Sequence, residues 1–321
     1  MAMPYKLIYN PHAGEKGHPF SHAPMMTLDR LQGLVRRYEL AVDFFPTTGP
    51  KHATVLARAS VNEGYETVIV AGGDGTVGEA ANGLVGTNIR LGILPFGTFM
   101  NVARMLSIPT DLEQAMLLIK VGKTRKIDLG CVTKMEGEKL LDPYYFIESA
   151  GIGLDAQLQT SVLAWERKRY QKAWKALALM RTVYHRPITL DLDQKTMVVH
   201  ASLVTIANGP VSGASLKVSP DSKLNDHQLS VSIFEMNRFE FIRHFWYLLR
   251  GKEHRPLTIQ TFKTSRIAIS ATDDRPVHVD ARLFGTLPAE FKIISEALTV
   301  IVGFPEERSE SGLKERTYLA P

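Results

Sequence analysis

Five residues between a β-branched segment and a helical one have the composition of a phosphate-binding turn. Residues 67–71 (Thr-Val-Ile-Val-Ala) lead directly into Gly72-Gly73-Asp74-Gly75-Thr76. A strand end, a glycine turn and a helix start present backbone N–H groups to phosphate oxygens. Glycine is expected here because a Cβ atom would block positive φ angles and the close approach of a phosphate group.

The side chains of this turn add chemistry to the backbone donors. Asp74 places a negative charge where anions would bind, which indicates that a cation or a proton transfer takes part. Thr76 can cap the following helix or contact a phosphate oxygen. The glycines alone also fit an ordinary strand-to-helix turn, so a phosphate site depends on the residues around them.

Strand-like and helix-like segments alternate around the turn through the first 128 residues. Continuous apolar strands separated by helices are typical of a parallel sheet with helices on both faces. The predicted strands are 6–10, 42–45, 67–71 and 89–94, and the predicted helices are 25–38, 51–62, 77–84, 100–106 and 112–121.

The pattern changes near residue 126, where short strand-like segments begin to follow one another closely. Many short strands favour an antiparallel sheet or sandwich. We therefore predict an α/β nucleotide-binding domain at 1–128, a β-rich antiparallel domain at 129–304 and a loosely ordered tail at 305–321. The predicted strands are 127–133, 144–149, 188–192, 197–207, 228–234, 257–262, 266–270, 277–279, 290–294 and 298–302, and the predicted helices are 156–184 and 239–249.

Composition narrows the function classes. The 321 residues carry one cysteine, Cys131, which excludes an internal disulfide and fits a reducing compartment. No signal peptide or membrane-spanning run is present, so we predict a cytoplasmic protein. A net charge of +5 suits an anionic partner such as a nucleotide or an acidic membrane surface, and nothing indicates nucleic acid.

The string from residue 72 to residue 84 (Gly-Gly-Asp-Gly-Thr-Val-Gly-Glu-Ala-Ala-Asn-Gly-Leu) resembles the diacylglycerol kinase catalytic-domain family. That family includes bacterial lipid kinases and the sphingosine and ceramide kinases. NAD kinases and phosphofructokinases share a similar turn, but Glu79 and Asn82-Gly83-Leu84 match the lipid kinase form. The resemblance implies a nucleotide-binding α/β domain of NAD-kinase type and a β-rich second domain, with the active site between them.

Three further motifs extend the resemblance. Asn10-Pro11 with Gly14 is similar to the family's Asn-Pro-x-x-Gly, and Thr47 stands in the place of a nucleotide-contacting threonine. Residues 91–98 (Leu-Gly-Ile-Leu-Pro-Phe-Gly-Thr) resemble the second nucleotide loop. The ATP ligands implied by the resemblance are Asn10, Thr47, Gly72, Gly73, Asp74, Gly75, Thr76, Glu79, Gly97 and Thr98.

The resemblance also implies a magnesium site. Asp226 matches the aspartate of the family's Asp-Gly pair, with backbone carbonyls near Lys223 and Gln228 as the other ligands. His227 follows it here in place of glycine, which changes the loop. Taken without the family, Asp226 fits an ordinary turn residue next to Asn225.

The position of the general base departs from the family. A glutamate of an Asp-Gly-Glu turn accepts the hydroxyl proton in the family, and the corresponding residues here are Asp280-Ala281-Arg282. Arginine can stabilise phosphate charge but cannot accept a proton. Asp280, Asp74 or Glu79 could serve instead, or the chain could bind nucleotide without transferring its phosphate. A second departure, Phe99-Met100-Asn101, would reshape the acceptor pocket.

Two basic amphipathic segments concern the acceptor. Residues 156–184 interleave apolar residues with Lys168, Lys172 and Lys175, and residues 239–249 have arginines at their flanks. Such helices can lie on an anionic membrane, here at its inner face, or cover a core with a solvated basic face. A lipid acceptor comes from the family resemblance.

Three functions therefore compete. The first is an ATP- and Mg²⁺-dependent kinase for a diacylglycerol-like hydroxyl, the second a soluble-substrate kinase of NAD-kinase type, and the third a non-catalytic nucleotide or lipid sensor, favoured by Arg282. The sequence leaves open the acceptor, the choice between ATP and GTP, and the oligomeric state, a homodimer included.

Overall fold

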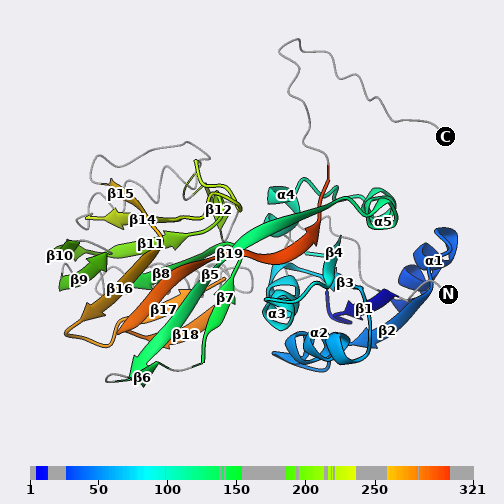
Figure 1. Cartoon of the computed structure of the whole chain (residues 1–321), viewed down its shortest axis with the longest axis horizontal. Helices are drawn as coiled ribbons and strands as arrows, with labels where there is room; N and C mark the ends of the chain where they lie inside the picture. The colour runs from blue at the N-terminus through cyan, green and yellow to red at the C-terminus, as the bar shows by residue number, and fades with distance from the viewer. Residues whose placement is uncertain are drawn as a thin grey trace, which may run out of the picture.

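Four short apolar strands build the sheet of the N-terminal half: β1 (Tyr5–Tyr9), β2 (Val42–Pro46), β3 (Thr67–Gly72) and β4 (Arg90–Pro95). They pair in parallel in the order β4-β3-β1-β2 (Figure 1). β3 is buried along its whole length because helices cover both faces of the sheet. The predicted parallel sheet is confirmed.

The computed structural model describes residues 5–13, 27–97, 99–136, 139–140, 142–153, 186–192, 195–212, 216–217, 219, 221–235, 259–280 and 282–303. Thr98, the predicted helices 156–184 and 239–249 and the predicted tail 305–321 lie outside the described residues. Among the described residues, no helix is long and apolar enough to cross a membrane.

The helices of the N-terminal half are α1 (Leu28–Arg37), α2 (His52–Asn62), α3 (Asp74–Leu84), α4 (Asn101–Met105) and α5 (Leu112–Val121). α1 and α5 lie on one face of the sheet, and α2 and α3 lie on the other (Figure 1). α5 begins at Asp111, whose side chain accepts a hydrogen bond from the Gln114 N–H at 3.0 Å. It ends at Gly122, which has a φ of 73°.

The start of α3 corrects the sequence prediction, which placed it at residue 77. The helix begins at Asp74, with Gly73 as its N-cap in an extended conformation. Asp74, Gly75 and Thr76 therefore form the first helical turn and do not belong to a loop.

The β-rich half consists mainly of antiparallel strands, as predicted. One six-stranded sheet has the order β15-β14-β11-β8-β17-β18, while β10, β9, β16 and β19 continue the N-terminal sheet beyond β4. The described strands of the β-rich half are β5 (Thr124–Glu136), β6 (Lys139–Leu140), β7 (Tyr144–Phe146), β8 (Ser149–Gly153), β9 (Arg186–Leu192), β10 (Lys195–Ala201), β11 (Leu203–Ala207), β12 (Val211–Ser212), β13 (Leu216–Lys217), β14 (Leu229–Phe234), β15 (Ile259–Thr264), β16 (Arg266–Ala271), β17 (Pro276–Val279), β18 (Arg282–Thr286) and β19 (Ala289–Ile301).

Three strand predictions are corrected. The predicted strand 197–207 is two strands of different sheets, β10 and β11, which separate at Ser202. The predicted strand 144–149 is likewise β7 and β8. The two predicted strands 290–294 and 298–302 are instead one strand, β19, whose register shifts between Ile294 and Leu298 around Glu296, which has a φ of 50°. Periodicity alone does not show where a strand changes sheet or contains a bulge.

Two long strands join the halves. β5 and β19 pair antiparallel and run from the β-rich half into the α/β half (Figure 1). The end of β19 pairs in parallel with β4, and Leu298 and Ile301 pack in the N-terminal core with Ile69 and Leu94. A second core lies between the sheets of the β-rich half. The domain boundary near residue 128 stays a prediction, because it falls inside β5.

Candidate active site

The carboxyl ends of the parallel strands bring most of the predicted nucleotide ligands to one edge of the sheet. Asn10 follows β1 and donates its N–H to the Ala71 carbonyl at 3.1 Å. Thr47 follows β2 and donates its N–H to the Tyr9 carbonyl at 2.8 Å. The glycine turn ends β3, and Gly97 follows β4. Four loops distant in sequence therefore meet where the pattern predicted the nucleotide.

Close approach, and not a positive φ, explains the glycines of this edge. Gly73 has a φ of −87°, and the glycines with positive φ among the described residues lie elsewhere. A Cβ atom on Gly97 would lie 2.9 Å from the Gly73 Cα, and one on Gly72 would lie 2.8 Å from the Thr76 Cβ. The expectation of positive φ angles is thus wrong, because the turn continues directly into α3. The glycines let two loops touch.

Asp74 connects the glycine turn to the next helix. Its Oδ1 accepts a hydrogen bond from the Val102 N–H at 3.0 Å, and the backbone of Asn101 and Met100 also donates to it. The carboxylate therefore caps the first turn of α4. Burial raises the pKa of Asp74, while these hydrogen bonds and the charge of Arg104 oppose that rise.

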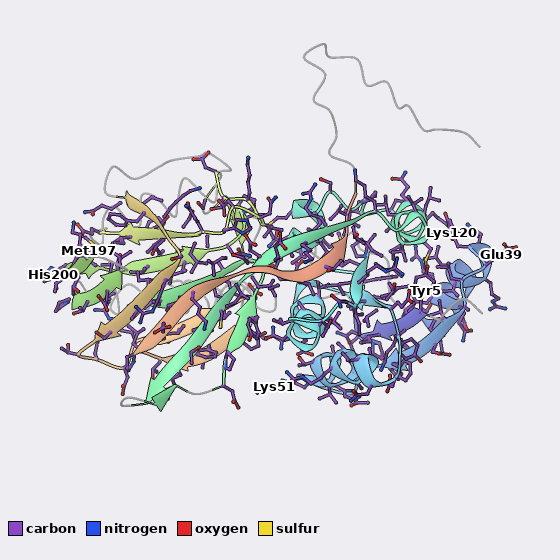
Figure 2. All side chains as sticks on the ribbon, in the orientation of Figure 1. Tyr5, Glu39, Lys51, Lys120, Met197 and His200 are labelled. Carbon is purple, nitrogen blue, oxygen red and sulfur yellow. The ribbon has the colours of Figure 1, made fainter. Side chains whose placement is uncertain are left out.

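Glu79 and Arg282 connect the two halves beside the turn. The buried Glu79 carboxylate accepts a hydrogen bond from the Lys51 N–H at 2.8 Å and forms an ion pair with the Arg282 guanidinium. Arg282 Nη2 also lies 3.3 Å from the Gly75 carbonyl oxygen. Figure 2 shows Lys51 on the side of the α/β half that faces the β-rich half. Glu79, predicted to bind nucleotide, thus binds protein groups that frame the turn.

Asp280 fixes the segment of the β-rich half that leads into β8. It follows β17 with a φ of 43°, and its carboxylate accepts hydrogen bonds from the N–H groups of Ile147, Glu148 and Ser149 at 3.0 to 3.2 Å. Burial, assisted by the negative charge of Asp74, raises the pKa of Asp280 to about 6 against the opposing effect of the hydrogen bonds. Asp74 and Asp280 are therefore close enough to influence each other's titration.

Sequence reasoning missed a buried polar contact between these two aspartates. The Asn101 side chain donates to Glu148 Oε2 at 2.9 Å, and both residues are buried. The Glu148 N–H donates in turn to Asp280. The signal was present in the sequence, because a glutamate inside the apolar segment of β7 and β8 is buried only when it is paired.

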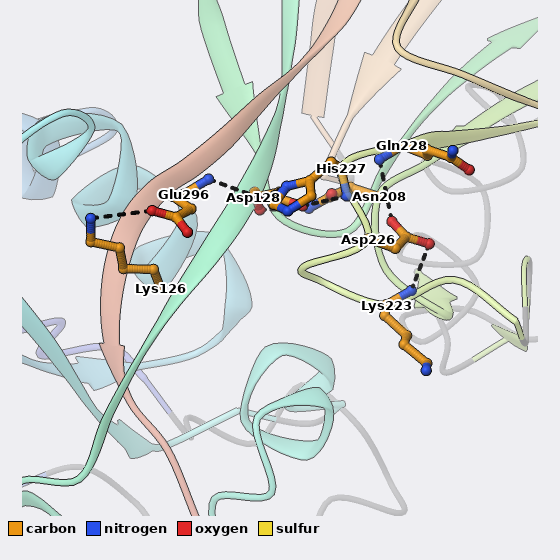
Figure 3. Close-up of polar contacts among 8 residues, drawn as sticks. All are labelled: Lys126, Asp128, Asn208, Lys223, Asp226, His227, Gln228 and Glu296. Atoms are coloured by element: carbon orange, nitrogen blue, oxygen red, sulfur yellow. Dashed lines mark hydrogen bonds and ion pairs between the residues drawn. The ribbon is translucent and has the colours of Figure 1, made fainter.

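The predicted metal ligands lie in the loop 221–228, which leads into β14 (Figure 3). Asp226 accepts hydrogen bonds from the Gln228 N–H at 3.3 Å and the Lys223 N–H at 3.4 Å. Its Oδ2 also lies 3.2 Å from the Lys263 Nζ. The part of the chain that the structure describes contains no cluster of three or more His, Cys, Asp or Glu residues that could hold a metal. Magnesium at Asp226 stays a prediction, and these donors do not fit it.

His227, the departure from the family's glycine, keeps a conformation that favours glycine. Its φ is 59°. The buried Asp128 accepts a hydrogen bond from the His227 N–H at 2.8 Å and lies 3.1 Å from its Nδ1 (Figure 3). Asp128 also accepts the Glu296 N–H at 2.8 Å. Asp128, which sequence reasoning did not select, therefore connects the loop to β5 and to the bulge in β19.

The geometry defines a class of protein: a parallel α/β half with a glycine turn, joined to a β-rich half as in NAD-kinase-like folds. A yeast NADH kinase complexed with NADH has this fold, with a TM-score of 0.53 and 10% identity over 94% of this chain and 84% of that chain. A diacylglycerol kinase structure from Bacillus anthracis has a TM-score of 0.66 and 20% identity, covering 94% of this chain and 97% of that chain.

Sequence comparison specifies the family. Residues 4–132 match the diacylglycerol kinase catalytic domain, and residues 148–302 match the YegS C-terminal NAD kinase beta sandwich-like domain. The chain belongs to the diacylglycerol kinase catalytic-domain family. A diacylglycerol kinase of Bacillus subtilis is 28% identical over 320 residues, 95% of this chain and 97% of the relative. One of Staphylococcus aureus is 28% identical over 295 residues, 89% of this chain and 88% of the relative. At the level of the family, the protein is a kinase.

Proposed function

We propose that this protein is an ATP- and magnesium-dependent kinase that phosphorylates a diacylglycerol-like lipid hydroxyl. The observation that carries the proposal is the contact between the glycine turn and the second loop, where a Cβ atom on Gly97 would lie 2.9 Å from the Gly73 Cα. The amides at the start of α3 then face the edge of the sheet where Asn10 and Thr47 also lie, as phosphate oxygens require. The relatives named diacylglycerol kinase support the lipid acceptor.

In the proposed reaction, the lipid hydroxyl oxygen attacks the γ-phosphorus, the bond to the β,γ-bridging oxygen breaks, and ADP leaves. Magnesium bound with the nucleotide would neutralise charge on its phosphates. The hydroxyl proton goes to the Asp74–Asp280 pair, which supplies carboxylates whose pKa values are raised by burial. A loose transition state needs little early deprotonation, so this pair supports slow turnover without the family's glutamate.

Arg282 is assigned to phosphate and not to proton transfer. Its guanidinium is part exposed and reaches the Gly75 carbonyl, so it lies next to the amides that would face the triphosphate. Simple restoration of the family glutamate, Arg282→Glu, would place a second carboxylate against the buried Glu79. Arg282→Glu in a Glu79→Gln background is therefore the fair test of this position.

The central experiment measures transfer of labelled γ-phosphate from ATP to candidate acceptors. Diacylglycerol in mixed micelles, NAD and a micelle without acceptor are compared at several magnesium concentrations. We expect label on diacylglycerol that is absent without magnesium and is lost in Asp74→Asn. Label on NAD would favour the soluble-substrate kinase.

The non-catalytic alternative is favoured by one observation, the engagement of Arg282 with Glu79 at the position of the base. Calorimetry separates it from the kinase. Nucleotide binding without label on any acceptor, in both the wild type and the Glu79→Gln/Arg282→Glu variant, would show a nucleotide-binding protein that does not transfer phosphate.

A lipid acceptor also requires contact with a membrane, which we propose to be peripheral and electrostatic. The basic residues Lys168, Lys172 and Lys175 lie outside the described residues, so their proposed role comes from sequence alone. Co-sedimentation with anionic vesicles should fall with salt and with charge reversal at these three positions. Binding that is insensitive to both changes would contradict this attachment.

A further inference from the structure

The carboxylate of Asp226 is mostly buried and has its charge balanced by the protein itself. Only 18% of its side chain is exposed, and the Lys263 ammonium lies 3.2 Å from Oδ2. Lys263 is carried by β15, which pairs with β14 directly after the loop 221–228. The counter-ion is thus fixed to the neighbouring strand.

The other groups around the Asp226 carboxylate are also hydrogen-bond donors, which suit an anion that is neutralised within the protein. Oδ1 receives the Gln228 N–H, and Oδ2 receives the Lys223 N–H together with the ammonium. The Lys223 carbonyl, a predicted metal ligand, accepts the Asp226 N–H at 3.3 Å. Magnesium requires oxygen ligands at about 2.0–2.1 Å in octahedral geometry. A magnesium ion here would meet N–H groups and would have to displace Lys263.

The same loop has a second attachment that needs no metal. Asp128 donates its N–H to the Leu224 carbonyl at 2.7 Å and accepts the His227 N–H at 2.8 Å. The loop is therefore held from β5 on one side and from β15 on the other.

We infer that the Lys263 ammonium takes the place of a divalent cation at Asp226, and that the loop 221–228 folds without magnesium. A fixed ammonium supplies one positive charge and hydrogen-bond donors to the carboxylate, which is what a bound cation would contribute to the stability of the loop. The magnesium of the proposed kinase reaction then enters only with the nucleotide. This inference concerns folding and metal binding, so it stands or fails independently of the kinase activity.

The test is thermal unfolding of the full chain without nucleotide, in EDTA and in millimolar magnesium chloride at matched ionic strength. The variants are Lys263→Met, Asp226→Asn and the control Lys223→Met, which removes a charge from the same loop while keeping the amide that contacts Asp226. We expect equal melting temperatures in both buffers for the wild type and the control. Lys263→Met should melt about 1–3 °C lower in both buffers, because the contact is part exposed and because the N–H groups that remain around Asp226 do not suit magnesium.

Direct binding completes the test, with Mn²⁺ as a spectroscopic probe in place of magnesium. The wild type and Asp226→Asn should bind Mn²⁺ equally, because the carboxylate is already paired. A wild-type Mn²⁺ site or magnesium-dependent melting temperature that disappears in Asp226→Asn would overturn the inference. Equal stability of Lys263→Met and wild type, without a response to magnesium, would also overturn it, because Lys263 would then hold nothing.

Discussion

The two sides of the candidate site use different means to place charge. On the glycine-turn side, backbone N–H groups and glycines form the surface, and Gly97 leaves no room for a Cβ atom, which would lie 2.9 Å from the Gly73 Cα. Elsewhere charge is placed by two pairs of oppositely charged side chains, Arg282 with Glu79 and Lys263 with Asp226, while a contact with Asp128 holds His227. Side chains cannot reproduce the backbone geometry of the glycine turn, whereas one pair of charged side chains can replace another. The chain could therefore depart from its family in the β-rich half without losing the fold.

The largest expected effect concerns Asp280, on the β-rich side of the candidate site. Unlike the side-chain pairs, its carboxylate accepts hydrogen bonds from three backbone N–H groups. Its pKa is raised from 3.8 to about 6, so the native state holds the proton more tightly than the unfolded chain does. Its contribution to stability is therefore fully present below pH 3.8 and is lost as the pH rises through 6, by about 3 kcal/mol in all. Urea unfolding should show the wild type losing most of this, about 2–2.5 kcal/mol, relative to Asp280→Asn between pH 4 and pH 7. A difference between the two proteins that does not change with pH would show that burial does not control this group.

The second prediction concerns the glycine-turn side, where substitution should harm nucleotide binding directly. Gly97→Val should weaken ATP affinity by at least tenfold, about 1.4 kcal/mol, because its Cβ would meet the Gly73 backbone. Gly75→Val should also weaken it, but less, because its Cβ would lie 3.3 Å from the flexible Arg282 side chain. Calorimetry on folded protein measures both.

Gly33 in α1 provides the matched control, since a Cβ atom there has nothing within 4 Å. Gly33→Ala should bind ATP as the wild type does and should be slightly more stable. Unchanged affinity in a folded Gly97→Val protein would remove the phosphate site from this edge of the sheet.

The third prediction breaks one of the charged pairs. Arg282→Met should destabilise the protein by about 1–2 kcal/mol, because the buried Glu79 keeps only the Lys51 N–H, while the part-exposed arginine is already screened by solvent. Glu79→Gln in the same chain should recover part of this loss, and a double-mutant cycle by chemical unfolding gives the coupling. Strictly additive effects would mean that the contact contributes nothing to holding the halves together.

The features that the sequence could predict depend mainly on the backbone, and those that it could not predict are contacts between pairs of side chains. The parallel sheet and the turn were predictable because strands such as β3 are apolar throughout and because glycines follow them. Asn10, Thr47 and Gly97 could be placed together because parallel strands share their carboxyl edge. These inferences need only local pattern and one topological rule.

The pairs across the halves were not predictable, because they join residues distant in sequence. Arg282 lies 203 positions from Glu79, and His227 lies 99 positions from Asp128. Departures from the family at 227 and 282 were visible in the sequence, but their partners were not. The bulge in β19 and the start of α3 were missed for a related reason, since both depend on contacts made by neighbouring strands and loops.

The smallest expected effect concerns His227, and it tests whether the loop keeps its glycine-like backbone. Its φ of 59° costs a residue with a Cβ atom about 1–2 kcal/mol. His227→Ala and His227→Gly both remove the imidazole contact with Asp128, so they differ only in backbone terms. Glycine avoids the cost of the left-handed backbone conformation. It also makes the unfolded chain more flexible, which reduces this gain in the free energy of unfolding by about 0.4–1 kcal/mol. His227→Gly should thus be more stable than His227→Ala by about 0.5–1 kcal/mol in chemical unfolding.

Asn225, exposed in the same loop and without a positive φ, is the matched control, and there alanine should be the more stable substitution. If His227→Ala is also more stable than His227→Gly, the strained backbone at that position is contradicted and the side-chain contact alone shapes the loop.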